Sequence, residues 1–207
     1  MTVKLVGSTS GSVSLQAPAS TTGGAHRVLT LPDINSTIDT TGRPGNILQV
    51  VQTVKTDAFS VLNTTSTDIT GMNVTITPTS SSNKMLISAF FFGEGNFNEH
   101  EIQFQIERTI SGGATTNIRG ATAGNKGTCI AVPPQGYAGF DNSSTPFNMA
   151  FNGLLDTPGT TSAITYTLQC RAATGSRTVY YNRTINESDN ASSERGLSWL
   201  TVMEVSA

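Results

Sequence analysis

Strict alternation of apolar and polar residues over short segments is the feature that most constrains the fold of this chain. Four segments show it, at residues 74–76, 102–107, 147–152 and 164–171. A period of two places the apolar side chains of an extended strand on one face. No long stretch repeats with the 3.6-residue period of a helix. The alternation therefore predicts an all-β chain.

Further apolar segments add to these strands. Residues 47–54 and 179–182 are predicted strands, and the apolar run at 85–92 is predicted to be a strand buried on both faces. Gly112-Gly113 and residues 156–159 have the composition of turns. Roughly eight to ten strands separated by turns predict an antiparallel β-sandwich or jelly roll.

The last predicted strand, at residues 199–205, is apolar on both faces. Its side chains divide into Leu200 and Val202 on one face and Trp199, Met203 and Val205 on the other. A flat apolar strand at a sheet edge promotes aggregation. We therefore expect this strand to lie inside a sheet or an interface.

Residues 1–45 differ from the rest of the chain, because Gly, Ser, Thr and Pro dominate and apolar residues are sparse. Short alternations at residues 13–17 and 28–31 are too small to form a stable sheet in a monomer. They could become ordered around copies of themselves or on a larger body. The turn ending at Gly45 predicts a boundary between an attachment or trimerisation segment (1–45) and a β-sandwich head (46–207).

Charge and hydropathy exclude two classes of partner. Charged residues are 13% of the chain, about half the usual ~25%, the net charge is −2, and no Lys/Arg stripe is present. Duplex nucleic acid is therefore not an expected ligand. The start of the chain lacks the apolar core of a secretory signal, and the longest apolar run, at residues 87–92, is too short to cross a bilayer. We expect a protein made in a cytoplasm, without membrane insertion.

The low apolar content, 36%, indicates that each subunit buries little surface by itself. Partner subunits could supply the remaining burial. Cys129 and Cys170 are the two cysteines, and no C-x-x-C motif is present. Both are expected to be small core residues rather than zinc ligands or a redox pair.

Candidates for catalysis and metal binding are few. The densest cluster is Glu94, Glu99, His100 and Glu101, but in a strand His100 would point away from its two neighbours. A polar hairpin turn is the favoured interpretation, and a cation held by several copies of the cluster on a threefold axis is the alternative. Residues 186–190 lack the order of an EF-hand loop and are expected to be a solvated loop.

Known catalytic motifs are also missing from the sequence. The histidines are His26 and His100, and neither a G-x-S-x-G elbow nor a phosphate-binding loop is found. The sparse carboxylates argue against a polysaccharide-cleaving spike with paired acids. We therefore expect a protein that is not an enzyme, with no catalytic residues, no cofactor and no metal.

Three sets of short segments follow one another along most of the chain. They are LVGS (5–8), SVSLQAPAS (12–20) and LTLPD (29–33); GNILQVVQ (45–52), TDITG (67–71) and VTITP (74–78); and YNR (181–183) with LTVMEV (200–205). In this order and spacing they resemble bacteriophage tail-fibre and virion-fibre proteins. The resemblance implies a fibre-like N-terminal segment, ordered in a trimer or attached to the particle. It also implies a C1q/TNF-like jelly-roll head packed around a threefold axis.

The resemblance predicts a non-enzymatic bacteriophage virion protein, a short tail-fibre or spike subunit made in the host bacterial cytoplasm. It would act as a homotrimer, bind other virion proteins through its N-terminal segment and present a head that could bind a host-surface polysaccharide. The alternative is a capsid decoration or head-fibre protein that attaches to the capsid lattice through the same segment.

Loops at one end of such a head are the expected place for recognition. The longest candidates are residues 120–127, 133–146 and 186–196. The middle loop contains Tyr137 and Phe140, whose rings could stack on sugars, and Gln135 and Asn142, whose amides could bind hydroxyls. These four residues are the predicted receptor-binding site. In the alternative interpretation, the two rings only pin the loop to the sandwich.

Overall fold

The computed structural model describes residues 2–6, 12–16, 24, 43–63, 65–96, 102–134, 144–172 and 177–207. The chain divides into two compact units, Met1–Asp39 and Thr40–Ala207. In the first unit, β1 (Thr2–Val6) and β2 (Ser12–Gln16) form an antiparallel pair. The alternation predicted at residues 13–17 largely coincides with β2, and the one predicted at 28–31 lies outside the described residues.

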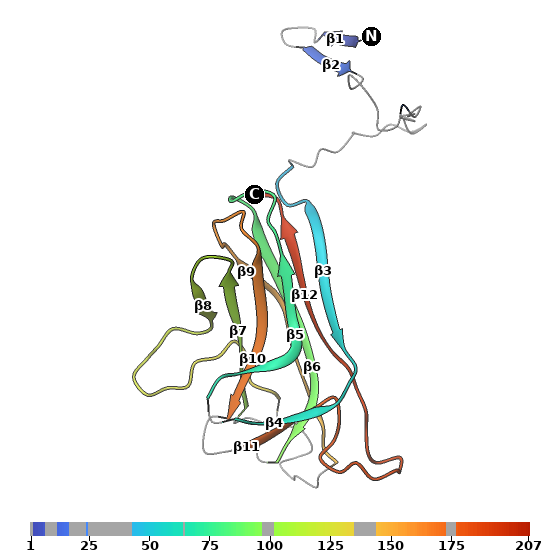
Figure 1. Cartoon of the computed structure of the whole chain (residues 1–207), viewed down its shortest axis with the longest axis vertical. Coiled ribbons are helices and arrows are strands. Elements are labelled where there is room, and N and C mark those ends of the chain that lie inside the picture. Colours follow the sequence, from blue (N-terminus) through green and yellow to red (C-terminus); the bar gives the residue numbers. More distant parts are fainter. Residues whose placement is uncertain are drawn as a thin grey trace. The chain divides into compact units, whose positions relative to one another are not determined.

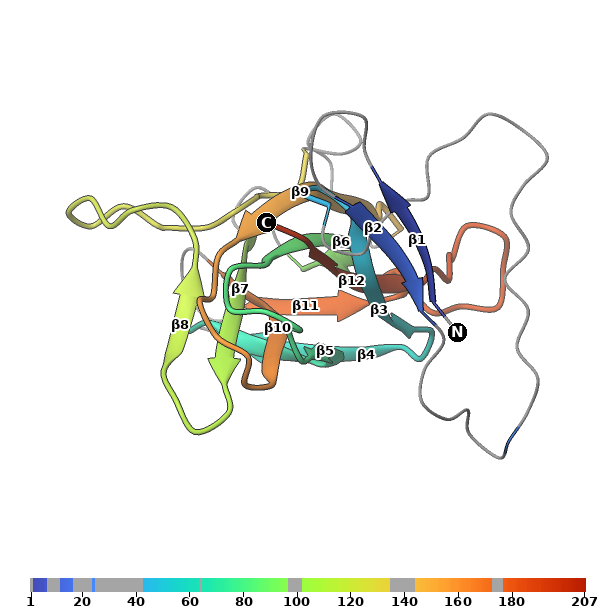
Figure 2. The ribbon, with the colours of Figure 1, turned by 90° about the horizontal axis from the view of Figure 1, so that it is seen from above.

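The second unit is a sandwich of two antiparallel sheets (Figures 1 and 2). Sheet I contains β3 (Ile47–Lys55), β12 (Ser198–Val205), β6 (Lys84–Gly95) and β9 (Phe147–Asp156), with β11 (Arg177–Tyr181) and β4 (Phe59–Asn63) added beside the end of β6. Sheet II contains β5 (Thr67–Ile76), β10 (Ile164–Ala172), β7 (Ile102–Ile110) and β8 (Thr115–Ile118).

The strand order is that of a jelly roll. In sheet I, β12 lies between β3 and β6, and β9 pairs with the other edge of β6. In sheet II, β10 lies between β5 and β7. Strands that are distant in the sequence thus alternate within each sheet. The predicted all-β antiparallel sandwich is confirmed, as is the position of the last strand inside a sheet.

The core is formed by the inward residues of the alternating strands. In β7, Ile102, Phe104 and Ile106 are fully buried, whereas the alternate residues Gln103 and Glu107 are only partly buried and lie toward the outside of the sheet. The ring of Phe91 packs against Phe104 at 4.9 Å between centroids. Burial of such side chains stabilises the fold by about 1.5–3 kcal/mol each.

In the second unit, two strands were not predicted from the sequence. In β8 the residues Thr115, Thr116 and Asn117 are polar and exposed, so no apolar alternation marks this strand. It forms because it pairs along β7, where Thr115 lies opposite Thr109. The other, β4, pairs with β11, and its Phe59 ring stacks on Tyr181 at 4.3 Å between centroids.

Asn182 joins β11 to the main part of sheet I. It is fully buried and has a left-handed backbone with φ of 57°. Its Nδ2 donates hydrogen bonds to the carbonyl oxygens of Lys55 and Asp57, each at 2.9 Å, and its Oδ1 accepts one from Ser198 Oγ at 2.7 Å. This single side chain therefore fixes three segments at the point where β3 and β12 give way to β4 and β11.

Candidate interaction surfaces

The outer surface of sheet I is an almost uncharged apolar surface. We call it the apolar face, and it consists of Ile47, Val50, Val54, Leu86, Phe90, Ala150, Leu155, Trp199, Met203 and Val205. Since Leu200 and Val202 point into the core, their neighbours in β12 must point outward. Along these strand rows, within the described residues, the charged side chain is Lys84, at the margin opposite Val205.

Several side chains of the apolar face are strongly exposed for apolar residues. Ile47 and Val50 are each 56% exposed, and Leu155 is 50% exposed. Trp199 stacks against Phe90 at 6.2 Å between ring centroids and remains half-buried. Exposed apolar patches are common at the interaction sites of soluble proteins, so the apolar face is a candidate interaction surface.

This finding changes one prediction from the sequence. The strand at residues 85–92 was expected to be buried on both faces, but only its inward residues Met85, Ile87, Ala89 and Phe91 are fully buried. The outward residues Leu86, Ser88 and Phe90 of β6 are half-buried, because no second layer from the described part of the sandwich packs on them. The sequence signal for the apolar face was therefore the apolar content of both faces of β6 and β12.

The outer surface of sheet II is polar across all four strands. One row consists of Thr75, Thr165, Thr109 and Thr115. Two hydroxyl pairs link this row, Thr75 with Thr165 at 2.9 Å and Thr109 with Thr115 at 3.1 Å. We call this surface the polar face.

A second group on the polar face centres on Gln169. Its Nε2 donates to Asp68 Oδ1 at 2.7 Å and to Glu107 Oε2 at 3.0 Å, and its Oε1 accepts from Gln105 Nε2 at 2.6 Å. These amides satisfy one another and are nearly buried. The two outer surfaces of the sandwich thus differ in kind, one apolar and the other hydrogen-bonded.

One end of the sandwich is organised by the buried carboxylate of Glu204. It accepts hydrogen bonds from Asn83 Nδ2 at 2.6 Å, Gln49 Nε2 at 2.6 Å, and Thr79 N and Oγ1 at 2.7 and 2.8 Å. Burial by itself would raise the pKa of Glu204, but these hydrogen bonds outweigh it and hold the pKa below its usual value. The start of β3, the turn between β5 and β6 and the end of β12 are held together there.

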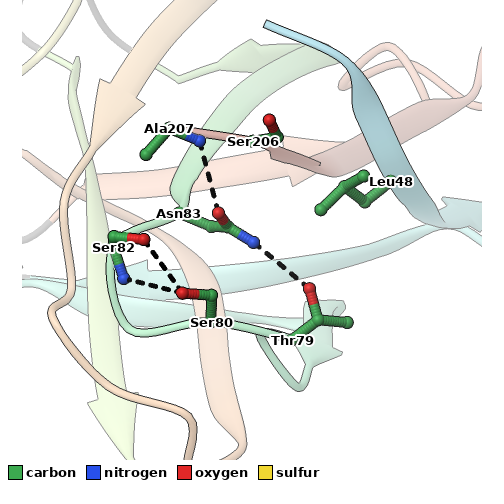
Figure 3. A pocket seen from close by; sticks show the side chains of 7 residues that line it. All are labelled: Leu48, Thr79, Ser80, Ser82, Asn83, Ser206 and Ala207. Carbon is green, nitrogen blue, oxygen red and sulfur yellow. Dashed lines mark hydrogen bonds between the residues drawn. The ribbon is translucent and has the colours of Figure 1, made fainter. Parts of the chain in front are cut away.

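A cavity of about 550 Å³ lies at the same end, lined by small polar side chains and one leucine (Figure 3). Its lining residues are Leu48, Thr79, Ser80, Ser82, Asn83, Ser206 and Ala207. Beside it, Ser206 fixes the start of the unit, because its backbone oxygen accepts from Gly45 N at 2.9 Å and its hydroxyl donates to the Arg43 carbonyl at 2.5 Å. Residues 43–46 therefore connect the sandwich to the preceding part of the chain at this end.

Glu94 organises the opposite end of the sandwich. Its Oε1 accepts from Thr145 N and Oγ1 at 2.9 and 3.0 Å, and its Oε2 accepts from Ile185 N at 2.8 Å. Glu94 is fully buried within β6, so it is not part of the polar hairpin turn that the sequence favoured. Its predicted companions Glu99, His100 and Glu101 lie outside the described residues.

The predicted receptor-binding residues Gln135, Tyr137, Phe140 and Asn142 also lie outside the described residues. Both flanks of their loop are described. On one side the Ala131 carbonyl accepts from Phe104 N at 2.9 Å, and on the other side Glu94 holds Thr145. The loop therefore starts and ends on rigid parts of the sandwich.

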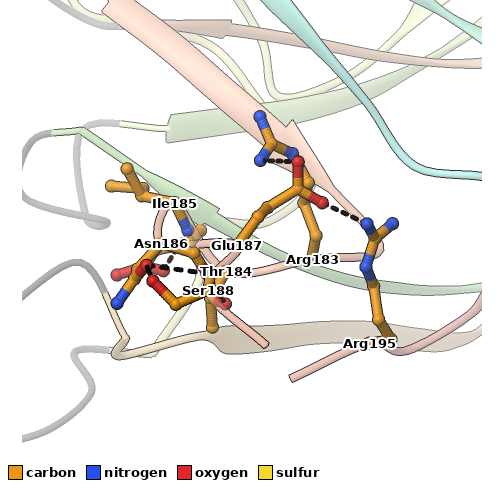
Figure 4. A network of polar contacts seen from close by, with 8 residues as sticks. Arg183, Thr184, Ile185, Asn186, Glu187, Ser188 and Arg195 are labelled. Carbon is orange, nitrogen blue, oxygen red and sulfur yellow. Dashed lines mark hydrogen bonds and ion pairs between the residues drawn. The ribbon is translucent and has the colours of Figure 1, made fainter. Parts of the chain in front are cut away.

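The connection between β11 and β12 is a structured polar loop (Figure 4). Glu187 forms ion pairs with Arg183 and Arg195, and Arg183 also lies over the Tyr180 ring at 4.5 Å. A small hollow of about 260 Å³ is lined by residues of this loop, including Asp189 and Glu194. Much of the loop is exposed, in keeping with the solvated loop expected at residues 186–190.

Neither cysteine is paired with the other. Cys170 is fully buried, and its Sγ lies 3.0 Å from Tyr181 Oη, whereas Cys129 is only half-buried in the connection after β8. The core position predicted for both is therefore correct for Cys170 alone. Among the residues that the structure describes, no three Asp, Glu, His or Cys side chains converge on a metal site, and no helix could span a membrane.

Comparison with known proteins gives distant similarities only. No protein-family model and no curated protein matches the chain. A structure of infectious bursal disease virus, Gx strain, matches with 15% identity and a TM-score of 0.39, over 94% of this chain and 43% of that chain. The VP2 subviral particle of that virus matches with 16% identity and a TM-score of 0.32, over 87% and 42%. This chain spans less than half the length of those chains, and such similarities do not assign it to a family.

Proposed function

We propose that this chain is a non-enzymatic virion structural protein, a short tail-fibre or spike subunit that acts as a homotrimer. The observation that supports this most directly is the apolar face on one side of a sandwich whose other side is polar. The N-terminal segment would attach the subunit to other virion proteins. The head would contact a host-surface glycan through loops at its far end.

A second copy of the same chain is the partner that best fits the apolar face. In a cyclic trimer the same face of every copy can point at the symmetry axis, and charges on that face would then lie close to like charges of the other copies. The apolar face avoids this cost, because along its described strand rows the charged neighbour is Lys84, which lies at the margin. Burying Val50, Trp199 and Leu155 against another copy would contribute about 1.5–3 kcal/mol for each well-buried side chain. The number of three copies comes from the resemblance to fibre proteins.

The N-terminal connection and the flanks of the predicted receptor loop lie at opposite ends of the sandwich. This supports the proposal that one end attaches the subunit and the other end recognises the host. The connection to the N-terminal segment, at residues 43–46, lies at the end organised by Glu204. The flanks of the predicted receptor loop lie at the end organised by Glu94. Since β6 runs from one end to the other, a subunit attached at the first end would present the second end outward.

Light scattering of the full-length protein tests the assembly. We expect three times the 21.7-kDa mass of one chain. The Val50→Asp variant places a charge at an exposed position of edge strand β3 and should lower the mass to that of the monomer. The control is Thr115→Asp, which adds the same charge to edge strand β8 on the polar face and should keep the trimer. A monomeric wild-type protein would refute the homotrimer.

A binding comparison then separates a fibre from a capsid decoration protein. Fluorescently labelled protein is mixed with host cells and, separately, with genome-filled capsids that lack it. Binding to cells that is lost after enzymatic removal of surface polysaccharide supports the fibre. Binding to capsids alone overturns the fibre in favour of the decoration protein.

A further inference from the structure

A row of polar side chains crosses the middle of the apolar face. Gln52 of β3 lies opposite Thr201 of β12, which lies opposite Ser88 of β6. Gln52 Nε2 donates to Thr201 Oγ1 at 2.6 Å, and Ser88 Oγ accepts from Gly153 N of β9 at 3.4 Å. The row of side chains therefore crosses β3, β12 and β6, contacts a backbone N–H of β9, and interrupts an otherwise apolar surface.

Each of these side chains has hydrogen-bonding capacity left over. Thr201 accepts from Gln52, so its hydroxyl proton is available, although the residue is only 5% exposed. The amide oxygen of Gln52 and the hydroxyl proton of Ser88 likewise have no hydrogen-bond partner among the described residues. A polar group buried without a partner costs about 1–3 kcal/mol.

We propose that this polar row sets the alignment between copies of the chain when their apolar faces meet. The inference rests on the proposed homo-oligomer and names the residues that determine its register. Apolar contacts have no preferred direction, so they tolerate one copy sliding along another. A hydrogen-bonding row penalises every position in which it faces apolar residues.

The spacing of the rows makes this penalty effective. The row of Val54, Trp199 and Phe90 lies on one side of the polar row, and the row of Val50, Met203 and Leu86 lies on the other. Adjacent rows on one face are separated by two residues, which is roughly 6.5 Å along a strand. A slip by one row would therefore place the polar groups of one copy against apolar side chains of the next.

Cyclic symmetry brings the polar row of one copy to the same level as the polar rows of the other copies. Every residue has the same height along the axis in each copy, so strands that run along the axis place the polar rows of all copies at one level. There the unused donors and acceptors can bond to one another or to shared water molecules. Staggered contacts do not close and would generate assemblies of variable size.

The test is a triple variant, Gln52→Leu, Thr201→Val and Ser88→Ala, which makes the apolar face continuous. Light scattering over a hundredfold range of concentration should show one mass for the wild type and a spread of masses that grows with concentration for the variant. The isosteric Thr201→Val variant should change in the same direction and guards against misfolding of the triple variant. Circular dichroism confirms that each variant is folded.

The matched control removes three hydroxyls from the polar face, in the variant Thr75→Val, Thr165→Val and Thr109→Val, and should keep the wild-type mass. If the wild type forms one oligomer and both apolar-face variants keep it unchanged, the role of the polar row is overturned while the proposed assembly stands. If the wild type is a monomer at every concentration, the assembly and the inference are both overturned.

Discussion

At the scale of single residues, buried polar side chains hold the ends of the sandwich together. Glu204 and Glu94 are both fully buried, and each joins segments that are far apart in the sequence. Asn182 does the same where β11 meets the rest of sheet I. Such groups are stabilising only while every partner is in place, because a buried group without one is costly.

The carboxylate of Glu204 should make folding stability depend on pH. Its pKa is lowered in the folded protein, so its contribution is present above the pKa of the unfolded residue and is lost as the pH falls through the folded pKa. We expect Glu204→Gln to lower the free energy of unfolding by about 1–3 kcal/mol at neutral pH, since an amide cannot accept all four hydrogen bonds. Urea unfolding measures this difference.

The same measurement at about pH 3 should give a smaller difference between wild type and Glu204→Gln, because the carboxyl of the unfolded chain, with its ordinary pKa, is then largely protonated. Asp189→Asn, at an exposed loop position, is the control and should change stability by less than about 0.5 kcal/mol. An equal loss for Glu204→Gln at both pH values would contradict the role given to its charge.

Asn182 allows the backbone and side-chain contributions to be separated. Replacement by Ala removes its hydrogen bonds and also leaves a Cβ in the left-handed region, whereas replacement by Gly removes the hydrogen bonds alone. We expect both variants to be destabilised, with Ala about 1 kcal/mol less stable than Gly. Thermal unfolding compares them, and equal stability of the two would show that the backbone at φ 57° is not strained.

At the scale of elements, β6 is the central strand of the sandwich. It pairs with β12 on one edge and β9 on the other, and its last residues pair with β11. Its length explains why the apolar run at residues 85–92 was visible in the sequence. The shorter β4 and β8 depend on the strands that they pair with, so their formation is a tertiary property.

Gly93 is where β6 passes closest to its neighbours. A Cβ at this position would lie 2.2 Å from the Tyr180 carbonyl oxygen and 2.7 Å from the Phe91 ring. We expect Gly93→Ala to destabilise the fold by about 1–3 kcal/mol, because the carbonyl belongs to the paired strand β11 and cannot move freely. Gly120→Ala is the control, since its nearest contact would be an ordinary 3.5 Å. Similar urea midpoints for the two variants would contradict this packing.

At the scale of the whole molecule, the difference between the two outer surfaces is the property on which the proposed assembly rests. Sheet I presents an apolar face and sheet II a polar face, although both sheets share one core. In the proposed assembly, the apolar face would contact other copies and the polar face would contact water. The apolar face also carries a tryptophan, whose fluorescence would report on assembly through this face.

Trp199 is the one tryptophan of the chain and lies on the apolar face. Assembly through this face should bury its indole further, so its fluorescence emission should move to longer wavelength when the oligomer dissociates on dilution. The Val50→Asp variant should show the dissociated spectrum even at high concentration, whereas Thr115→Asp should match the wild type. Emission independent of dilution, in a protein whose mass does change, would place the interface elsewhere.

The sequence by itself determined the class of fold, because strict alternation in segments such as residues 102–107 and 164–171 fixes which side chains face the core. It also indicated that the last strand lies within a sheet. Both conclusions can be drawn without knowing which strands are neighbours, since the pattern of apolar residues along an extended strand is a local property of the chain.

Only the tertiary structure decided which side chains form the outer surfaces and which polar groups are buried. The apolar face and its polar row exist because β3, β12, β6 and β9 become neighbours, and that pairing joins residues as distant as Gln52 and Thr201. The burial of Glu94 and Glu204 likewise depends on partners from other strands and loops. A sequence shows the character of each side chain along one strand, but a surface is a property of several strands laid side by side.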